Sequence, residues 1–196
     1  LSGLTCVHVD AHLDMMDDGF NPKILEGIKA ARTRAELDQF RGDADLPWGG
    51  FHCGNYLYPA LLDGTVTTLI WLLPREVIKG TSLLDGSRQE LQNWVDLTFE
   101  EYSSFRFEDG RVEGTLMGCR MVVCTSESFP ELSAAEKKNL ALDIDVDYFV
   151  RLKDDKIWQT PYQLKDALGP IEPVALTVAM SCEGGYTPTA ERYLGQ

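Results

Sequence analysis

Short hydrophobic runs alternate with amphipathic stretches along most of the chain. A short apolar run bounded by turn residues is typical of a strand buried on both faces of a parallel sheet. Such runs predict strands at residues 4–9, 66–72, 121–124, 140–147 and 174–180. Apolar residues at helical spacing predict helices at residues 21–40, 56–62, 87–102 and 162–168. This alternation favours an α/β fold with a mainly parallel sheet flanked by helices.

Local signals add detail to this outline. Residues 105–107 and 112–116 flank Asp109-Gly110, a dipeptide that favours the tight turn of a β-hairpin. The spacing of Ser133 and Glu136 is that of a capping box, which predicts a further short helix. The helix at residues 87–102 is expected to present an apolar face formed by Leu91, Trp94, Val95, Leu97 and Phe99.

Two clusters of acidic residues follow predicted strands. The first consists of Asp10, His12 and Asp14, and the second consists of Asp143, Asp145 and Asp147. An extended backbone points alternate side chains to the same side, where unpaired carboxylates repel one another unless a cation neutralises them. Ligands of parallel sheets bind outside the carboxyl ends of the strands, so we expect the clusters to converge there, together with residues 181–183. The alternative for each cluster alone is a polar loop entrance, because aspartate is common in turns.

The donor set indicates the kind of metal and of chemistry. Oxygen-rich ligation with a minority of imidazole favours Mn²⁺, with Zn, Fe and Co as substitutes. Two such ions close together activate water for attack on an electrophilic carbon. The clusters therefore predict a two-metal site and metal-assisted hydrolysis.

The composition narrows the classes of partner. With 196 residues, of which 44% are hydrophobic, the chain can bury one sizeable core, which predicts one domain. The net charge of -13 argues against nucleic acid and suits a cationic substrate or metal ions, although acidity also serves solubility. Five cysteines without a Cys-x-x-Cys pair indicate a reduced, cytoplasmic protein, and no apolar stretch is long enough to cross a membrane.

Both clusters resemble signatures of a known family. Residues 8–14, His-Val-Asp-Ala-His-Leu-Asp, resemble the Asp-Ala-His-x-Asp signature of the ureohydrolases, which include arginases and agmatinases. Residues 142–147, Leu-Asp-Ile-Asp-Val-Asp, resemble the Ser-x-Asp-x-Asp signature of the same family. The resemblance implies a three-layer arginase-like fold, with residues 1–196 forming a single domain that binds two Mn²⁺ ions.

The resemblance also implies ligand roles. Asp10 would bridge both ions, His12 would bind one and Asp14 the other. In the second cluster, three aspartates occupy positions where the family has two ligands. The preferred register makes Asp145 the bridging ligand and Asp147 its neighbour, with Asp143 and Asp145 as the alternative. The family's upstream Gly-Gly-Asp-His, which supplies another ligand, is absent from the sequence, and we expect that histidine to lie upstream of Leu1.

Further residues are candidates for catalysis and substrate binding. His52 precedes a short helix, as the family's catalytic histidine does, and either it or Asp14 would move a proton to the departing amine; the alternative for His52 is a loop histidine. Glu183 follows the last strand, where ureohydrolases place a glutamate that pairs with the guanidinium, unless it is a turn residue before two glycines. Asn55 would contact substrate or cap a helix.

The departures from free-arginine enzymes point to a particular branch. Those enzymes follow the first signature with Asn and Ser that hold the charges of the amino acid, whereas this chain has Met-Met-Asp-Asp at residues 15–18. The amino-acid sequence, including Gly54-Asn55-Tyr56 and residues 145–149, resembles the sequences of the family branch that contains the peptide arginases. Such an enzyme removes urea from arginine side chains in a peptide to leave ornithine.

Other functions fit the same residues. They are a guanidino hydrolase that acts on a small molecule such as agmatine, a Zn²⁺ deacetylase of the arginase-like fold, and a metal-binding domain without catalysis. The sequence does not set the oligomeric state, and a homo-oligomer is compatible with it.

Overall fold

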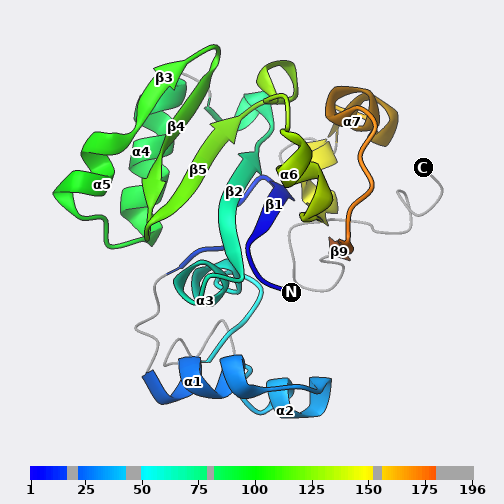
Figure 1. The fold of residues 1–196 in the computed structure, drawn as a ribbon. Coiled ribbons are helices and arrows are strands. Elements are labelled where there is room, and N and C mark those ends of the chain that lie inside the picture. The colour runs from blue at the N-terminus through cyan, green and yellow to red at the C-terminus, as the bar shows by residue number, and fades with distance from the viewer. Residues whose placement is uncertain (17–21, 43–49, 79–81, 152–155, 180–196) are drawn as a thin grey trace.

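A mixed seven-stranded sheet forms the framework of the protein, in the order β3-β4-β5-β2-β1-β6-β9 (Figure 1). The computed structural model describes residues 1–16, 22–42, 50–78, 82–151 and 156–179. The strands of this sheet are β1 (Leu4–Val9), β2 (Val66–Leu72), β3 (Arg106–Glu108), β4 (Arg111–Leu116), β5 (Cys119–Cys124), β6 (Leu140–Asp145) and β9 (Ala175–Ala179). Strands β5, β2, β1, β6 and β9 run parallel to one another, whereas β4 pairs antiparallel with both β3 and β5. Two short strands, β7 (Val150–Arg151) and β8 (Lys156–Ile157), pair separately.

Strand β1 lies inside the sheet between β2 and β6, and all six of its residues are buried. This position explains why its sequence is a continuous apolar run, since both faces of the strand are covered. Its register with β6 places His8 beside Asp143. The sheet therefore brings the first acidic cluster next to the second.

Helices pack on both faces of the sheet, because successive strand residues point to opposite faces. On one face, Cys6 and Leu69 belong to an apolar core with Leu61 of helix α3 (Leu57–Leu62) and Leu91 of helix α4 (Leu83–Trp94). On the other face, Val7 and Ile70 belong to a second core that includes Leu164 and Leu168 of helix α7 (Pro161–Leu168). Figure 1 shows α4 and helix α5 (Phe99–Ser104) beside β3 to β5, and α7 towards the β9 end. The described residues therefore form an α/β fold with helices on both sides of a mostly parallel sheet.

The helical elements are short. They are α1 (Pro22–Ala30), α2 (Arg34–Asp38), α3 (Leu57–Leu62), α4 (Leu83–Trp94), α5 (Phe99–Ser104), α6 (Ala134–Lys138) and α7 (Pro161–Leu168), with 3-10 turns η1 (Arg75–Ile78), η2 (Ser126–Ser128) and η3 (Val146–Phe149). Within the part of the chain that the structure describes, no helix has the length and apolar character needed to cross a membrane.

The two long helices predicted from the sequence are each divided in two. Thr33 and Glu36 form a capping box that starts α2, so the predicted helix at residues 21–40 is wrong as a single element. Thr98 and Glu101 form another capping box that starts α5, which divides the predicted helix at residues 87–102. Of its predicted apolar face, Leu91 and Val95 are buried, Leu97 packs against the core, and Trp94 and Phe99 are exposed.

Other predicted elements are confirmed. Strands β1 and β2 have the predicted bounds, and Ser133 caps α6 with Glu136 as its capping-box partner. The hairpin turn has positive φ at Asp109 (49°) and Gly110 (79°), as its tight turn requires. The predicted strand at residues 140–147 is too long, because β6 ends at Asp145 and the chain turns into η3.

Candidate metal centre

The two acidic clusters meet where the parallel strands β1 and β6 end. We call the set of His8, Asp10, His12, Asp14, Asp143, Asp145 and Asp147 the strand-edge cluster. Its two halves are in contact, because His12 Nδ1 lies 2.8 Å from Asp147 Oδ2. The main-chain N–H of Ala11 also donates to Asp147 Oδ1 over 3.4 Å. The expected convergence of the two clusters is therefore confirmed.

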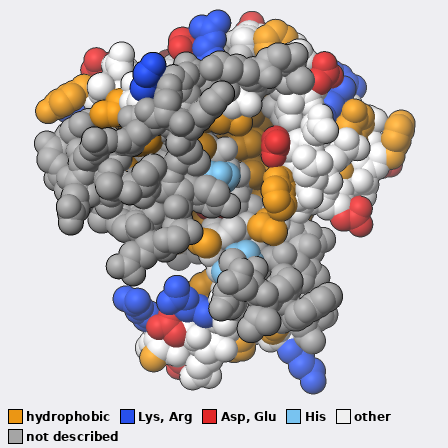
Figure 2. Space-filling view, turned by 180° about the vertical axis from the view of Figure 1, so that it is seen from behind, with side chains coloured by type: hydrophobic (Ala, Val, Ile, Leu, Met, Phe, Trp, Pro, Cys, Tyr) orange, Lys and Arg blue, Asp and Glu red, His pale blue; other side chains and the backbone are white. Residues whose placement is uncertain are grey.

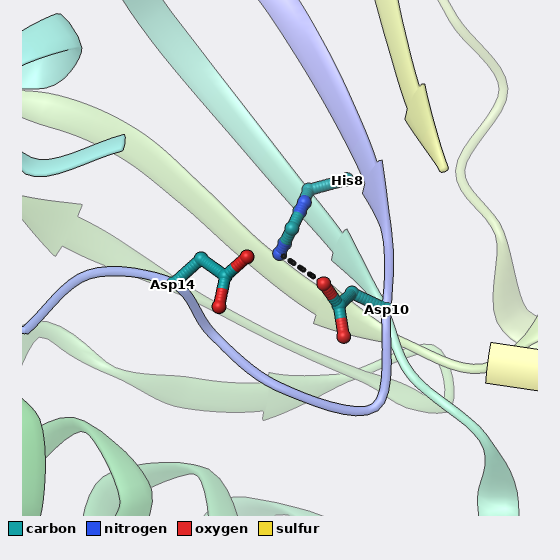
Figure 3. Close-up of side chains that lie close together, drawn as sticks. All are labelled: His8, Asp10 and Asp14. Carbon is teal, nitrogen blue, oxygen red and sulfur yellow. Dashed lines mark ion pairs between the residues drawn. The ribbon is translucent and has the colours of Figure 1, made fainter. Parts of the chain in front are cut away.

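One set of potential metal ligands consists of His8, Asp10 and Asp14. Each offers a ligand atom within 4.8 Å of the others. Figure 3 shows both carboxylates directed at the same nitrogen of the His8 ring, and Asp10 Oδ2 lies 3.4 Å from His8 Nε2. His8 and Asp10 are fully buried at 0% and 1% exposure, and Asp14 is partly buried, so the inner side of this set is shielded from water.

A second set consists of Asp10, His12 and Asp147, again with ligand atoms within 4.8 Å of one another. His12 Nδ1 is 3.4 Å from Asp10 Oδ1. The His12 side chain is 39% exposed, which leaves this set open to solvent. In the space-filling view, histidine side chains reach the surface in a recess bordered by hydrophobic side chains (Figure 2). Asp10 belongs to both sets, so the geometry suits two neighbouring cations that share one carboxylate.

The loop after β1 is shaped by local contacts. Asp10 Oδ1 accepts the main-chain N–H of His12 over 2.6 Å, a turn that aspartate favours. Asp14 has a φ of 51°, a left-handed conformation that turns the chain back towards β1. The loop is anchored on its outer side by the main-chain bond from Leu57 N to Asp14 O, 3.3 Å long. On its inner side, the buried indole N–H of Trp71 donates to the main-chain oxygen of Asp10 over 3.0 Å.

The three aspartates of the second cluster have different contacts. Asp143 accepts hydrogen bonds from the Tyr56 hydroxyl and the Thr177 hydroxyl, and it contacts His8. Asp145 accepts the N–H of Asp147 over 3.1 Å and so caps η3. Asp147 alone joins a ligand set within the described residues. The prediction of three carboxylates along one extended strand is wrong, because the 3-10 turn redirects Asp147; the ligand role of Asp145 stays a prediction.

Burial and mutual repulsion give the strand-edge cluster unusual proton affinities. Burial, followed by the charge of Asp10, raises the pKa of Asp14 to about 8. Burial and the nearby Asp147 raise the pKa of Asp145 to about 7. Hydrogen bonds to Asp10 and Asp147 raise the pKa of His12 to about 11. The cluster therefore holds protons at neutral pH when no other cation is present.

The charges of the cluster fit a divalent cation. Five carboxylates, Asp10, Asp14, Asp143, Asp145 and Asp147, are gathered around the two imidazoles of His8 and His12. Among the described residues, the ion pairs of the cluster involve only these two histidines. Carboxylates in such a buried place need compensating positive charge. The oxygen-rich donor set is the kind that Mn²⁺ and similar ions prefer.

The remaining predicted site residues lie outside the two ligand sets or outside the described chain. The main-chain N–H of Gly54 donates to His52 Nδ1 over 3.1 Å, and the main-chain bond from Met16 N to Gly54 O brings this loop against the Asp14 loop. Asn55 is fully buried: its Oδ1 accepts the N–H of His52 over 2.7 Å and its Nδ2 donates to Gly50 O over 3.1 Å.

These contacts show what the two loop residues do in the fold. Asn55 holds the loop together, and the cap position of α3 is occupied by Tyr56 instead. A proton-transfer role for His52 and a substrate contact for Asn55 stay predictions. Glu183 lies outside the residues that the structure describes.

Sequence reasoning gave no site role to His8, Tyr56 or Thr177. His8 could have been found, because alternation along β1 places it on the same side as Asp10. Tyr56 and Thr177 reach Asp143 from segments far away in the sequence, and no local pattern indicates this.

Comparison of the sequence with known proteins does not assign it to a family. No protein-family model matches the sequence, and no curated protein matches it.

Proposed function

We propose that the protein is a metal-dependent hydrolase that removes urea from arginine side chains in peptides and leaves ornithine. It would be a ureohydrolase with the arginase-like variant of the three-layer fold and two Mn²⁺ ions, for which other divalent ions could substitute. The observation that carries the proposal is the position of Asp10 in both ligand sets. A carboxylate that belongs to both sets would allow two cations to lie close together, as the ions of two-metal hydrolases do, and the likeness of residues 8–14 and 142–147 to ureohydrolase signatures supplies the substrate class.

The residues present fit such a pair of ions. Asp10 and Asp14 would hold one cation, and Asp10, His12 and Asp147 would hold the other. Bound there, the ions would supply Lewis acidity, which lowers the pKa of water and stabilises negative charge that develops at the attacked carbon. In the protein, Asp10 is buried beneath the site, and the His12 side chain is accessible to solvent.

The reaction consumes one water for each guanidinium. A C–O bond forms when the water oxygen adds to the guanidinium carbon, and the bond from that carbon to the side-chain nitrogen then breaks, which releases urea. The departing nitrogen takes up the two hydrogens that the water loses and becomes the ammonium group of ornithine. Asp14 or His52 would carry a proton from the water to that nitrogen, since both lie on the two loops that pack together beside the ligand sets.

Three features support a peptide substrate. Met15, which stands where free-arginine enzymes have a polar residue, is completely buried and offers no polar group to the charges of a free amino acid. The second ligand set is open to solvent at His12, so an arginine side chain could enter while its backbone stays outside. The net charge of -13 also favours a cationic peptide.

A direct assay tests the proposal. The protein loaded with Mn²⁺ is incubated with an arginine-containing peptide, with free arginine and with agmatine, and both urea and the mass of the product are measured. We expect urea release with conversion of peptide arginine to ornithine, and none with Asp10→Asn. If wild type releases urea only from agmatine, the peptide assignment is wrong, and no urea from any guanidino compound would overturn the hydrolase proposal.

One observation favours a second candidate. The set of Asp10, His12 and Asp147 alone has the composition of a single Zn²⁺ site in deacetylases of the arginase-like fold. Metal content separates the two, because the deacetylase needs one ion per chain and the ureohydrolase needs two. Release of acetate from an acetylated amine substrate by protein that holds one Zn²⁺ would favour this alternative.

A further inference from the structure

His8 has both ring nitrogens in contact with the strand-edge cluster, although it is completely buried in the middle of the sheet. Its Nδ1 lies 2.8 Å from Asp143 Oδ2. Asp143 in turn accepts the hydroxyl hydrogens of Tyr56 and Thr177. An ionised carboxylate can only accept, so the Nδ1 hydrogen of His8 must be the donor to Asp143.

These contacts follow from the register of the sheet. His8 on β1 is opposite Asp143 on β6, and Asp143 is opposite Thr177 on β9. The three side chains thus form one row across three neighbouring parallel strands, and Tyr56 closes the row from the residue before α3. The Tyr56 ring also meets the His8 ring edge-on, with ring centroids 6.3 Å apart. Both the position and the tilt of the imidazole are therefore fixed.

The other nitrogen of His8 faces oxygen atoms. Within the described residues, Nε2 contacts the main-chain oxygen of His12 at 3.1 Å and Asp10 Oδ2 at 3.4 Å. Asp14 points to the same place (Figure 3). With its hydrogen on Nδ1, a neutral imidazole presents a lone pair at Nε2, and a lone pair cannot bond to these acceptors. Something positive must lie between them, which is either a second ring proton or a metal ion.

We propose that His8 is a metal ligand through Nε2, in the set that it forms with Asp10 and Asp14, and that Asp143, held by Tyr56 and Thr177, positions its ring. This inference rests on the metal centre of the proposed function. Metal-binding histidines generally donate their other ring N–H to a carboxylate, which fixes the ring and the tautomer. Asp143 is therefore a positioning residue and not a ligand, and β1 supplies the imidazole of the buried ion.

Nitrogen NMR of the unaltered protein is the main test. The chain contains three histidines, so a sample labelled with ¹⁵N-histidine gives three ring systems, and His52→Gln assists their assignment. Zn²⁺ serves as a diamagnetic probe ion. After two equivalents bind, we expect His8 to lose the Nε2 proton, to show a metal-bound Nε2 and to keep a slowly exchanging Nδ1 proton. Protons on both nitrogens of His8 in the loaded protein would overturn the inference.

Variants test the positioning row. His8→Gln should lower the number of bound ions from two to one. Asp143→Asn keeps every ligand, so it should retain both ions but weaken the buried one by about ten- to a hundredfold. Tyr56→Phe and Thr177→Val each remove one donor to Asp143 and should weaken binding less. Ser87→Ala removes a buried hydroxyl on α4, whose partner is Leu83 O, and is the matched control with wild-type metal affinity.

The outcomes separate this inference from the proposed function. If wild type binds two ions and His8 is not among the ligands, the role of His8 is wrong and the hydrolase proposal stands. If His8 binds metal but no guanidino compound yields urea, the role of His8 stands and the hydrolase proposal is wrong. Absence of metal binding by wild type would overturn both.

Discussion

Two regions of the sheet carry closely spaced charges and compensate them in opposite ways. Cations and carboxylates alternate in an Arg–Glu network formed by Arg111 and Glu113 on β4, Arg120 on β5 and Glu136 on α6. Its ion pairs are 2.6 Å, 3.0 Å and 2.9 Å long, and each arginine has a glutamate partner. In the strand-edge cluster, five carboxylates face two histidines among the residues that the structure describes. Within those residues the first region is balanced, with as many arginines as glutamates, whereas carboxylates outnumber histidines in the second.

Burial makes this difference matter. The side chains of the Arg–Glu network are 20% to 40% exposed, so water screens them and each pair contributes little. His8 and Asp10 are shielded from water, where an uncompensated charge is costly. The comparison teaches that a charge cluster points to a ligand when it is both buried and unbalanced, and that short distances alone do not.

The largest expected effect comes from removing the carboxylate that both ligand sets share. Asp10→Asn should abolish binding of both ions, because each set loses a charged ligand. Metal content by elemental analysis and Mn²⁺ titration measure this. Glu113→Gln, which removes a carboxylate from the balanced region, is the control and should leave metal content unchanged. Retention of two tightly held ions by Asp10→Asn would remove the basis of the comparison.

The next largest effect is expected in the pH dependence of metal affinity at the strand-edge cluster. Burial opposes protonation of His8, but its bond to Asp143 and the charges of Asp10 and Asp14 outweigh burial and raise its pKa to about 9. His8 and His12 are thus protonated at pH 7 without metal, and ions must displace those protons. Metal affinity should rise about tenfold per pH unit for each displaced proton between pH 6 and 9.

Stability of the metal-free protein should move with pH in the opposite direction. A histidine whose pKa is raised on folding stabilises the protein fully at pH values below its pKa in the unfolded chain. For His8, this stabilisation is lost as the pH rises through about 9, its pKa in the folded protein. Asp14, with a pKa raised to about 8, acts in the same direction, because its ionisation in the folded state is unfavourable. Denaturant titrations at several pH values measure this. If the free energy of unfolding of the metal-free protein increases from pH 7 to 9, the raised pKa values of His8 and Asp14 are wrong.

Bound ions should also stabilise the fold. Mn²⁺ at a hundred times its dissociation constant should add about 3 kcal/mol, which corresponds to about 6–12 °C in Tm for a chain of this size. Thermal unfolding with Mn²⁺ and with a chelator measures the difference. The same comparison on Asp10→Asn should give no shift, and an equal shift in that variant would show that the ions bind elsewhere.

The smallest effect is expected in the balanced region. Glu113→Gln removes the carboxylate that contacts both Arg111 and Arg120, and it should lower the free energy of unfolding by about 1 kcal/mol or less. The loss should shrink further at high salt, because exposed ion pairs are screened. Denaturant titrations at low and high ionic strength check this. A loss of several kcal/mol would mean that surface pairing matters as much as the buried cluster.

Much of the fold could be predicted because its signals are local. The bounds of β1 and β2 follow from apolar runs, and the hairpin turn follows from Asp109-Gly110. The division of the two helices does not follow from apolar periodicity, because it depends on the capping boxes that begin at Thr33 and Thr98. Those signals are present in the sequence, but a polar residue inside an amphipathic stretch does not by itself end a helix.

The site was predictable as a place more than as a set of contacts. The meeting of the carboxyl ends of parallel strands placed Asp10, His12 and Asp147 together correctly, but the predicted extended backbone after β1 is wrong, because the chain turns between Asp10 and Asp14. That Asp147 joins a ligand set while Asp143 contacts His8 was not predictable, because it depends on the turn that follows Asp145. The donors to Asp143 depend on the registry of β6 with β9 and on the placement of Tyr56, which only the three-dimensional arrangement decides.

The hydrogen bond from the Trp71 indole to the main-chain oxygen of Asp10 gives the protein an optical reporter of its own. Trp71 is buried in the apolar core at 2% exposure, which places its emission towards the blue, and it is one hydrogen bond from the residue shared by both ligand sets. A paramagnetic ion held by Asp10 would be close enough to quench that fluorescence. The fluorescence of Trp71 in the core would then report metal binding at the edge of the sheet.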